Sequence, residues 1–238
     1  MAEIQTLPVD LTRALTRKVG RAIQEFGMIG EGDRVMVAVS GGKDSYALLD
    51  LLEKLRRRSP VRFEIVACNV DQGYAGFRSD VIEDHLKAGG YRYHIEATEI
   101  AGTIRKKMDP EDAHCSLCAR PRRGVLFRLA TELGCNKIAL GHHADDIIET
   151  LLMLQFFNGQ IKAMPPVLRS ASGRHTVIRP MVYVWEQEVI AYAKERKFPV
   201  VCAAGNVHLP FLMDSRYLPD SCQPLRALTD EGPSFHSM

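Results

Sequence analysis

The sequence predicts an α/β fold in which helices cover both faces of a doubly wound, parallel sheet. Short β-branched segments alternate with segments of helical periodicity over most of the 238 residues, a pattern typical of parallel strands joined by crossover helices. Hydrophobic residues make up 46% of the chain, so a substantial core can form. At this length there is room for one α/β domain with a modest appendage, and not for a second large domain.

The elements are expected in a regular order after an N-terminal amphipathic helix. Apolar residues recur at helical spacing in that helix, at Leu11, Leu15, Val19, Ala22 and Phe26. Strands are expected at 35–39, 63–70, 91–95 and 137–140, and helices at 44–57, 77–88, 119–133, 144–157 and 186–197. A connection containing glycine and proline spans 158–180, and regularity fails beyond Pro199. We therefore expect an N-terminal helical segment (1–30), the α/β domain (31–201) and an irregular C-terminal tail (202–238).

The chain shows no sign of a membrane-spanning or secretory segment. No apolar run approaches the ~18 residues of a membrane span, and the N-terminus carries Glu3 and Asp10 in place of an apolar stretch. We therefore expect a cytoplasmic protein with no membrane partner. In such a reducing compartment, paired cysteines favour metal or redox chemistry over a disulfide framework.

The turn after the first strand has the composition of a phosphate-binding loop. Beyond Ala38 the chain continues, after one valine, as Ser40-Gly41-Gly42-Lys43-Asp44-Ser45 and leads into a helix. The two glycines let the backbone turn its N–H groups toward an anion, the helix N-terminus adds partial positive charge, and Lys43 adds a full charge. The Walker A loop of kinases is excluded, because Val37 stands at its first glycine and Asp44 at its Ser/Thr.

A second glycine turn is expected at the same rim of the sheet. Ligands of doubly wound sheets bind beyond the carboxyl ends of the strands, which brings 40–45, Asp71 and 141–146 together. The last segment reads Gly141-His142-His143-Ala144-Asp145-Asp146. Its two acids are either caps that complement the helix dipole or ligands that hold Mg²⁺ against phosphate oxygens, and the sequence leaves both functions open.

Cys115 and Cys118 form a Cys-x-x-Cys pair ahead of a predicted helix. Two thiols at this spacing can bind one metal or cluster from a single turn, and neighbouring guanidinium groups favour the thiolate form. Half a zinc site, a dithiol redox pair and part of an iron–sulfur site all use this spacing, so three alternatives stay open.

The net charge is only +2, but basic residues gather in four clusters. They are Arg13, Arg17, Lys18 and Arg21; Arg56, Arg57 and Arg58; Arg105, Lys106 and Lys107; and Arg120, Arg122 and Arg123. One cluster alone is typical of a solvated surface, whereas four near a nucleotide motif favour an RNA partner. The candidates for contacts with RNA phosphates or with the nucleotide are Arg120, Arg122 and Arg123.

Together these motifs resemble the tRNA 2-thiocytidine synthetase family of PP-loop ATP pyrophosphatases, over most of the chain. The resemblance is carried by Ser-Gly-Gly-Lys-Asp-Ser at 40–45, Cys-Ser-Leu-Cys-Ala-Arg-Pro-Arg-Arg-Gly at 115–124, Lys-Ile-Ala-Leu-Gly-His-His-Ala-Asp-Asp at 137–146, Met-Pro-Pro at 164–166 and Val-Ile-Arg-Pro at 177–180. It implies the N-type ATP pyrophosphatase fold, of the adenine nucleotide alpha hydrolase-like kind. It also implies tRNA thiolation, in which AMP is transferred to the C2 oxygen of an anticodon-loop cytidine and sulfur replaces that oxygen to give 2-thiocytidine.

The resemblance also implies roles for residues of this chain. The residues implied to bind ATP are Ala38, Ser40, Gly41, Gly42, Lys43, Asp44, Ser45, Asp71, Gly141, His142, Asp145 and Asp146. Mg²⁺ is implied to bind the phosphates of the ATP. Catalysis falls to Lys43, Asp44, Cys115 and Cys118. The implied partners are tRNA and a persulfide sulfur donor such as a cysteine desulfurase. The resemblance is also compatible with a homodimer.

The family holds a [4Fe–4S] cluster with three cysteines, of which two map onto Cys115 and Cys118. The family usually supplies the third from a second Cys-x-x-Cys after a Phe-Pro segment, but after 198–199 this chain has Cys202 alone. Cys202 is therefore the default third ligand and Cys222 the reserve. The remaining two cysteines, Cys68 in a strand and Cys135 near a helix end, are expected to be small buried residues.

Two other functions remain open at this point. A tRNA lysidine synthetase-like ligase shares the phosphate-binding loop, but it joins an amino acid to its substrate and needs no paired thiols, so Cys115 and Cys118 argue against it. The altered tail also allows a non-catalytic protein that binds ATP and tRNA without assembling a cluster. Iron and acid-labile sulfide on anaerobically purified protein would distinguish both from the thiolating enzyme.

Overall fold

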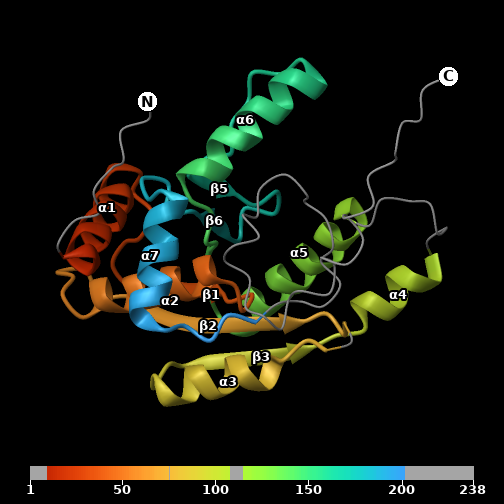
Figure 1. The fold of residues 1–238 in the computed structure, drawn as a ribbon, viewed down its shortest axis with the longest axis horizontal. Coiled ribbons are helices and arrows are strands. Elements are labelled where there is room, and N and C mark those ends of the chain that lie inside the picture. The colour runs from red at the N-terminus through yellow and green to blue at the C-terminus, as the bar shows by residue number, and fades with distance from the viewer. Residues whose placement is uncertain (1–9, 75, 108–114, 202–238) are drawn as a thin grey trace, which may run out of the picture.

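Figure 1 shows the computed structural model of the chain, which describes residues 10–74, 76–107 and 115–201. Its strands are β1 (Arg34–Ala38), β2 (Glu64–Asp71), β3 (Tyr93–Ala97), β4 (Lys137–Ala139), β5 (Val167–Arg169) and β6 (Thr176–Ile178). Its helices are α1 (Leu11–Glu25), α2 (Lys43–Arg56), α3 (Ser79–Ala88), α4 (Ile100–Lys107), α5 (Cys115–Glu132), α6 (Ala144–Asn158) and α7 (Glu186–Arg196). Strands and helices alternate through most of this order, as the sequence predicts.

The strands form one sheet with the order β3-β2-β1-β4-β6-β5. Strand β1 pairs in parallel with β2 and β4, β2 with β3, and β4 with β6, whereas β5 pairs antiparallel with β6. The chain extends the sheet from β1 first to one side and then to the other. The carboxyl ends of β1 and β4 therefore lie at the switch point where doubly wound sheets bind ligands. The predicted parallel sheet is confirmed, with β5 added as an antiparallel edge strand.

Two apolar cores cover the two faces of the sheet. Helices α1, α2, α3 and α7 contribute to the first core, and α4 and α5 to the second. Alternate residues of β1 face the two cores: Val35 and Val37 belong to the first, and Met36 and Ala38 to the second. Strands buried on both faces are typical of parallel sheets covered by crossover helices. This packing fixes the position of the loop that follows β1.

The segment 158–180, which the sequence predicts only as a connection containing glycine and proline, includes two strands. It contains a hairpin in which β5 and β6 pair with Leu168 opposite Val177, and Gly173 adopts a left-handed φ of +70° in its turn. Strands of three residues carry too little periodicity to be detected next to two prolines. Their structure depends on the pairing of β6 with β4, which is distant in sequence.

Two helices also differ from the prediction. Helix α4 is not expected from the sequence, because its short basic segment shows no clear apolar period. Helix α5 begins at Cys115, before the predicted start at 119, so the Cys-x-x-Cys pair forms the first turn of the helix rather than a turn ahead of it. The other predicted elements agree with the structure to within two residues at each end.

Helix α6 projects from the body of the molecule (Figure 1). Only Ala144 at its base is buried, although most of its residues are apolar. Large apolar side chains are exposed along it, at Ile148, Leu152, Met153, Phe156 and Phe157, and the last two are 76% and 82% exposed. A helix that is apolar on most sides is normally buried against other parts of a protein, so the exposed apolar surface of α6 is unusual.

Some expectations fall outside the described residues. The tail 202–238, with Cys202 and Cys222, is one such segment, and the first nine residues are another. Within the described ranges, none of the helices combines the length and the apolar character that crossing a membrane requires.

Candidate functional site

The phosphate-binding loop connects β1 to α2, and its own hydroxyl groups close it. The Ser45 Oγ donates to the Gly42 carbonyl oxygen at 2.8 Å and accepts from the Ser40 backbone N–H at 3.1 Å. Gly41 has φ +86°, and a Cβ on it would lie 2.9 Å from the Cδ1 of Ile82. Only glycine suits this position, because the left-handed backbone and the close packing both disfavour a side chain.

Helix α2 begins directly behind this loop. Its N-cap is Gly42, so no capping side chain accepts a hydrogen bond from the first N–H groups of the helix. Ala38, the last residue of β1, is buried and anchors the other end of the loop. An uncapped helix N-terminus behind a glycine turn fits the phosphates of a nucleotide.

Lys43 lies between two carboxylates at this N-terminus. Its Nζ is 3.2 Å from the Oδ1 of Asp44 and 2.9 Å from the Oε1 of Glu186. Burial by itself would lower the pKa of Lys43, but the two carboxylates outweigh burial and raise the pKa above its ordinary value. Burial raises the pKa of Asp44, although Lys43 opposes this. The lysine is therefore fully charged beside the phosphate-binding loop.

The second glycine turn adds three ionisable groups next to the loop. Gly141 packs tightly against the start of α2: a Cβ added to Gly141 would lie 3.0 Å from the carbonyl carbon and oxygen of Asp44. His143 is buried, with its Nδ1 3.4 Å from the Oδ2 of both Asp145 and Asp146 and its Nε2 3.8 Å from the Oδ1 of Asp44. The His143 backbone N–H donates to Asp146 Oδ2 at 2.8 Å. Asp146 thus caps α6 and also belongs to the same charged cluster as Asp44.

This cluster fits a magnesium ion that arrives with phosphates. The Oδ1 of Asp44 and the Nδ1 of His143 are buried and make no hydrogen bond within the described ranges. Across the same residues, no three His, Cys, Asp or Glu side chains form a ready metal site. Proteins usually bind Mg²⁺ through one or two carboxylates plus substrate phosphates, and the acids present suit that mode of binding.

Glu186 joins the site from α7, and the sequence does not assign it. Its backbone N–H donates to the Oδ2 of Asp145 at 2.7 Å, in addition to the ion pair of its carboxylate with Lys43. The N-termini of α2, α6 and α7 therefore meet at one place. In the sequence, Glu186 is only the first residue of a predicted helix, where acids are common as dipole caps. Only the packing of α7 against α2 reveals its second contact.

Basic residues lie near His142, on the second glycine turn. Arg179 follows β6, is 8% exposed, and donates from its Nε to the Nδ1 of His142 at 3.2 Å. Burial and the charge of Arg179 lower the pKa of His142 to about 4, with a further contribution from Arg122 of α5. Burial and the charge of Arg123 lower the pKa of Arg179. Arg122 and Arg123, two predicted RNA contacts, thus lie near the rim together with Arg179, which belongs to the Val-Ile-Arg-Pro motif but has no role assigned from the sequence.

The end of β2 contributes one predicted residue and one unpredicted residue. The Oδ1 of Asp71 accepts the Gly73 N–H at 2.9 Å, so this carboxylate shapes the loop that follows the strand. Asn69 is fully buried and donates from Nδ2 to the Val39 carbonyl oxygen at 2.7 Å. Its Oδ1 has no partner in the part of the chain that the structure describes. Asn69 therefore braces the residue from which the phosphate-binding loop starts.

Comparison with known proteins identifies the family. A family model for the PP-loop domain, ATP_bind_3, matches residues 11–211. The tRNA-cytidine(32) 2-sulfurtransferase of Geobacter sulfurreducens is 55% identical over 192 residues, which cover 81% of this chain and 75% of that protein. The protein of the same name from Citrifermentans bemidjiense is 56% identical over 188 residues, covering 79% and 74%. The chain belongs to this family.

Solved structures share the fold of this chain. The U34-tRNA thiolase NcsA from Methanococcus maripaludis, determined with its [4Fe-4S] cluster, gives a TM-score of 0.66 at 23% identity, covering 83% of this chain and 68% of that one. The NH3-dependent NAD synthetase from Campylobacter jejuni, in complex with the nitrate ion, gives 0.51 at 14% identity, covering 80% and 75%. At these identities the likeness shows a common fold, and it confirms the predicted fold class.

The predicted cluster ligands are only partly within the described residues. Cys115 and Cys118 belong to the first turn of α5, and their side chains, like that of Arg120, lie outside the description. Cys202 lies outside it altogether. The backbone N–H of Val201 donates to the carbonyl oxygen of Gly41 at 2.9 Å. The chain therefore contacts the phosphate-binding loop one residue before Cys202.

The two cysteines not expected to bind the cluster are buried. Cys68 in β2 is 1% exposed and Cys135 after α5 is 3% exposed. Burial raises the pKa of both thiols, that of Cys68 to about 12. Both are therefore protonated core residues, which confirms the prediction made from the sequence.

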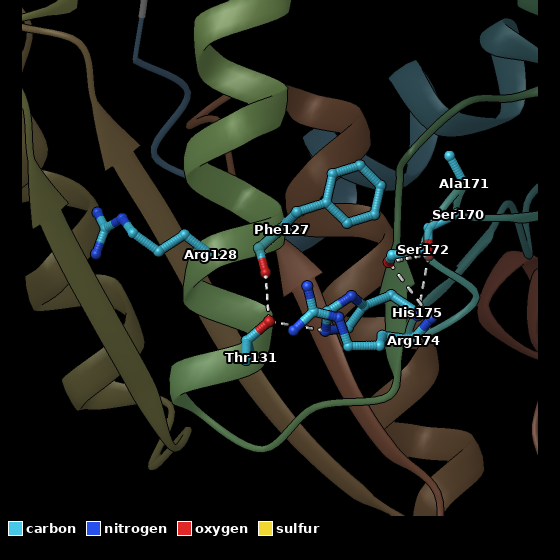
Figure 2. A pocket seen from close by; sticks show the side chains of 8 residues that line it. All are labelled: Phe127, Arg128, Thr131, Ser170, Ala171, Ser172, Arg174 and His175. Atoms are coloured by element: carbon cyan, nitrogen blue, oxygen red, sulfur yellow. Dashed lines mark hydrogen bonds between the residues drawn. The ribbon is translucent and has the colours of Figure 1, made fainter.

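A cavity of 340 Å³ lies between α5 and the β5–β6 hairpin (Figure 2). Its walls are Phe127, Arg128, Thr131, Ser170, Ala171, Ser172, Arg174 and His175. His175 comes directly before β6 and its Nε2 is 3.3 Å from the Oγ1 of Thr131, near the end of α5. The cavity is therefore at the amino ends of β4 and β6, opposite the edge of the sheet that carries the site.

Proposed function

We propose that the protein catalyses the ATP-dependent thiolation of cytidine 32 in tRNA. The C2 oxygen of the base is adenylated with release of pyrophosphate, and sulfur then displaces AMP to give 2-thiocytidine. The observation that carries the proposal is the meeting of Lys43 with carboxylates of α2, α6 and α7 behind the Gly41 turn, in a chain of the tRNA-cytidine(32) 2-sulfurtransferase family. Such a site suits the transfer of a nucleotide, because it combines a phosphate-binding backbone with fixed charges of both signs.

Adenylation depends on stabilising the leaving pyrophosphate. The C2 oxygen attacks the α-phosphorus, and the bond from that phosphorus to the bridging oxygen of pyrophosphate breaks. The N–H groups of the first turn of α2 and the Nζ of Lys43 are in place to stabilise the charge that develops. The other nucleotide contacts that we assign are Ala38, Ser40, Gly41, Gly42, Ser45, Asp71, Gly141 and His142. Asp44, Asp145 and Asp146 would hold Mg²⁺, which screens phosphate charge when bound.

Replacement of the adenylated oxygen requires sulfur from outside the chain. We assign Cys115, Cys118 and Cys202 as ligands of a [4Fe–4S] cluster. Three thiolates leave one iron free of protein ligands, and the cluster can present sulfur there when bound. The contact of Val201 with Gly41 supports this assignment, because it brings the chain to the phosphate-binding loop immediately before Cys202.

The proposed function implies a substrate and partners. The target base must leave its stack to reach the rim, which suits a single-stranded anticodon loop, and Arg120, Arg122 and Arg123 are candidates for its phosphates. A persulfide donor such as a cysteine desulfurase would supply the sulfur, and a thiol reductant would cleave the S–S bond so that sulfide-level sulfur displaces AMP. The cytoplasm suits this chemistry because thiols stay reduced there.

The exposed apolar side chains of α6 support a homodimer in which two copies cover this helix.

Product analysis with purified tRNA tests the proposal. The wild-type protein should convert ATP to AMP and pyrophosphate in a tRNA-dependent reaction, and nucleoside mass spectrometry should find 2-thiocytidine. Lys43→Met should abolish both products, whereas Lys87→Met should not, because Lys87 pairs with Glu83 on α3 away from the site. ADP as the product would refute the proposal. Incorporation of an amino acid into tRNA would support the ligase, and binding of ATP and tRNA without turnover would support the non-catalytic alternative.

A further inference from the structure

We propose that Arg179 is a positioning residue that holds His142 as one neutral tautomer, with the proton on Nε2, so that His142 donates a hydrogen bond to a phosphoryl oxygen of the bound substrate. The inference rests on the proposed function and deepens it, because it adds a hydrogen-bond donor to the nucleotide site and names the residue that orients it.

Arg179 is anchored at three points. Its backbone N–H donates to the Pro166 carbonyl oxygen at 2.9 Å, and its Nη1 donates to the Pro165 carbonyl oxygen. Its Nε donates to the Nδ1 of His142 at 3.2 Å. Burial and the charge of Arg123 lower the pKa of Arg179, and no carboxylate among the described residues raises it. A nearly buried guanidinium without an acidic partner therefore joins the Pro165–Pro166 turn to the glycine turn of the site.

The contact with Arg179 determines the tautomer of His142. A guanidinium group only donates hydrogen bonds, so the Nδ1 of His142 must accept and cannot carry a proton. A neutral imidazole then carries its proton on Nε2. The charged groups that act on this ring are Arg179 after β6, Arg122 of α5, Asp146 of α6 and the neighbouring His143. Burial and the arginines prevail over Asp146, which keeps the ring neutral at pH 7.

A neutral donor at this position has a clear use. His142 follows Gly141, which packs tightly against the Asp44 backbone, so the ring is attached next to the phosphate-binding loop. With Nδ1 engaged, the Nε2–H is the one polar hydrogen that the ring offers to a ligand. Phosphoryl oxygens are hydrogen-bond acceptors both in ATP and in the RNA backbone, so the shared chemistry of the ligand is an anionic phosphoryl oxygen.

Nuclear magnetic resonance of the full-length protein with ¹⁵N-labelled histidine tests the tautomer directly. His142 is assigned by the signal that disappears in His142→Gln. We expect an unprotonated Nδ1 and a protonated Nε2, unchanged from pH 8 to about pH 5.5. Arg179→Gln should raise the pKa of His142 toward the ordinary value of about 6.5. A proton on Nδ1 in the wild type, or the same titration in Arg179→Gln, would overturn the proposal.

Two amide substitutions separate a donor from a merely structural partner. In His142→Gln the side-chain amide reaches the place of Nε2, whereas in His142→Asn it reaches only the place of Nδ1. If His142 donates to the substrate, Gln should retain more turnover than Asn, which should lose it by about 100-fold, as for loss of one preorganised donor. If His142 only accepts from Arg179, Asn should retain more turnover, and this result or equal losses would contradict the proposal.

The same two variants identify the phosphoryl group. A rise in KM for ATP in His142→Asn indicates the nucleotide, and a rise in KM for tRNA indicates the RNA backbone. Circular dichroism and thermal unfolding confirm that each variant is folded, and the His142 pair remains informative if Arg179→Gln does not fold. A wild-type protein that forms no AMP would refute the proposed function but would leave the tautomer measurement decisive for Arg179.

Discussion

Asp44 carries a negative charge directly behind Lys43, and this pairing sets the electrostatics of the phosphate-binding loop. The carboxylates of Asp145, Asp146 and Glu186 add to it, so acids outnumber bases around the first turn of α2. A bare phosphate would be repelled by such a site. Phosphate that arrives with a divalent cation would be attracted, because the cation is bound by the acids while the N–H groups and Lys43 bind oxygen.

Asp44→Asn should lower AMP formation by about 100-fold or more while leaving the fold intact. Burial raises the pKa of Asp44, which means that the folded protein tolerates a neutral group there better than a charged one. Activity of the wild type should correspondingly fall with decreasing pH before ordinary aspartates titrate. Rates of pyrophosphate release across the pH range, compared with those of Asp80→Asn on the exposed start of α3, would check this. Wild-type rates in Asp44→Asn would show that the carboxylate has no part in the reaction.

The stability of the protein should decrease as the pH falls from about 6.5 to about 4. His142 has a folded pKa of about 4, below the ordinary value, so the unfolded chain binds the proton more tightly in this interval and folding weakens. Urea unfolding at several pH values measures the slope. His142→Gln should show a shallower decrease than the wild type, with a residual slope from His85 and His175, whose pKa values are also lowered by burial. Equal slopes would contradict a neutral buried His142.

The N-termini of three helices lie together at the site. Helices α2, α6 and α7 all begin at the carboxyl-end rim of the sheet, and each has an acid in its first turn. Positive helix ends brought together repel one another, and these acids offset that repulsion. These acids therefore have two explanations: they stabilise the helix ends, and they would bind the proposed cation. Gly141, in the turn before α6, packs tightly against the backbone of Asp44 at the start of α2.

Gly141→Ala should impair activity through this approach. The added methyl group would lie 3.0 Å from backbone atoms of Asp44, which cannot rotate away as a side chain could, so α2 and the second glycine turn must separate. The required shift is a few tenths of an ångström. Since a displacement of about 1 Å at a reacting centre can cost about 100-fold, we expect AMP formation to fall by about 10-fold. Gly30→Ala is the matched control, because the nearest atom to its added Cβ is 3.8 Å away. Unimpaired AMP formation in Gly141→Ala would show that the contact is not critical.

Helix α6 should mediate self-association. Its two exposed phenylalanine rings alone leave about 300 Å² of apolar surface in water, and interfaces of standard size bury about 800 Å² per partner. Phe156→Glu with Phe157→Glu should therefore convert a dimer to a monomer in sedimentation velocity experiments. Phe26→Glu, which adds the same charge at a half-exposed ring at the end of α1, should stay dimeric. A monomeric wild type, or a dimer that the α6 changes leave intact, would exclude this interface.

At the scale of the whole molecule, the proposed chemistry needs segments that are far apart in the chain. The phosphate-binding loop and Val201 are in contact, and Arg122 of α5 lies near His142 at the same rim of the sheet. Bringing a distant thiol to a cluster costs chain entropy, and this cost is smaller where the flanking residues are already fixed. Val201 is fixed by its hydrogen bond to Gly41, which favours Cys202 over Cys222.

The cluster assignment can be measured after anaerobic reconstitution. Cys115→Ser, Cys118→Ser and Cys202→Ser should each lose the broad visible absorbance of an iron–sulfur cluster, because two thiolates cannot hold a cubane stably. Cys222→Ser should keep it. Loss of absorbance in Cys222→Ser alone would show that the reserve ligand is the real one. A wild-type chain that takes up no iron would support the non-catalytic alternative.

The features that depend on neighbouring residues in the chain were predictable from the sequence. The alternation of strands and helices, the glycine turn at 40–45 and the acids that begin α6 are all local patterns, and most predicted element ends agree with the structure to within two residues. Local steric and hydrogen-bond preferences are enough to specify such features. The buried state of Cys68 and Cys135 was predictable for the same reason, because each lies in or beside an apolar run.

The distant residues that complete the site could be identified only from the fold. Glu186 reaches Lys43 across 143 positions, and Arg179 reaches His142 across 37. The short β5–β6 hairpin likewise exists because β6 pairs with β4. An acid at a helix start or an arginine before a proline has many local explanations, and none of them specifies a partner. Contacts of this kind are set by how whole elements pack on the sheet, since packing alone determines which side chains lie within hydrogen-bonding distance.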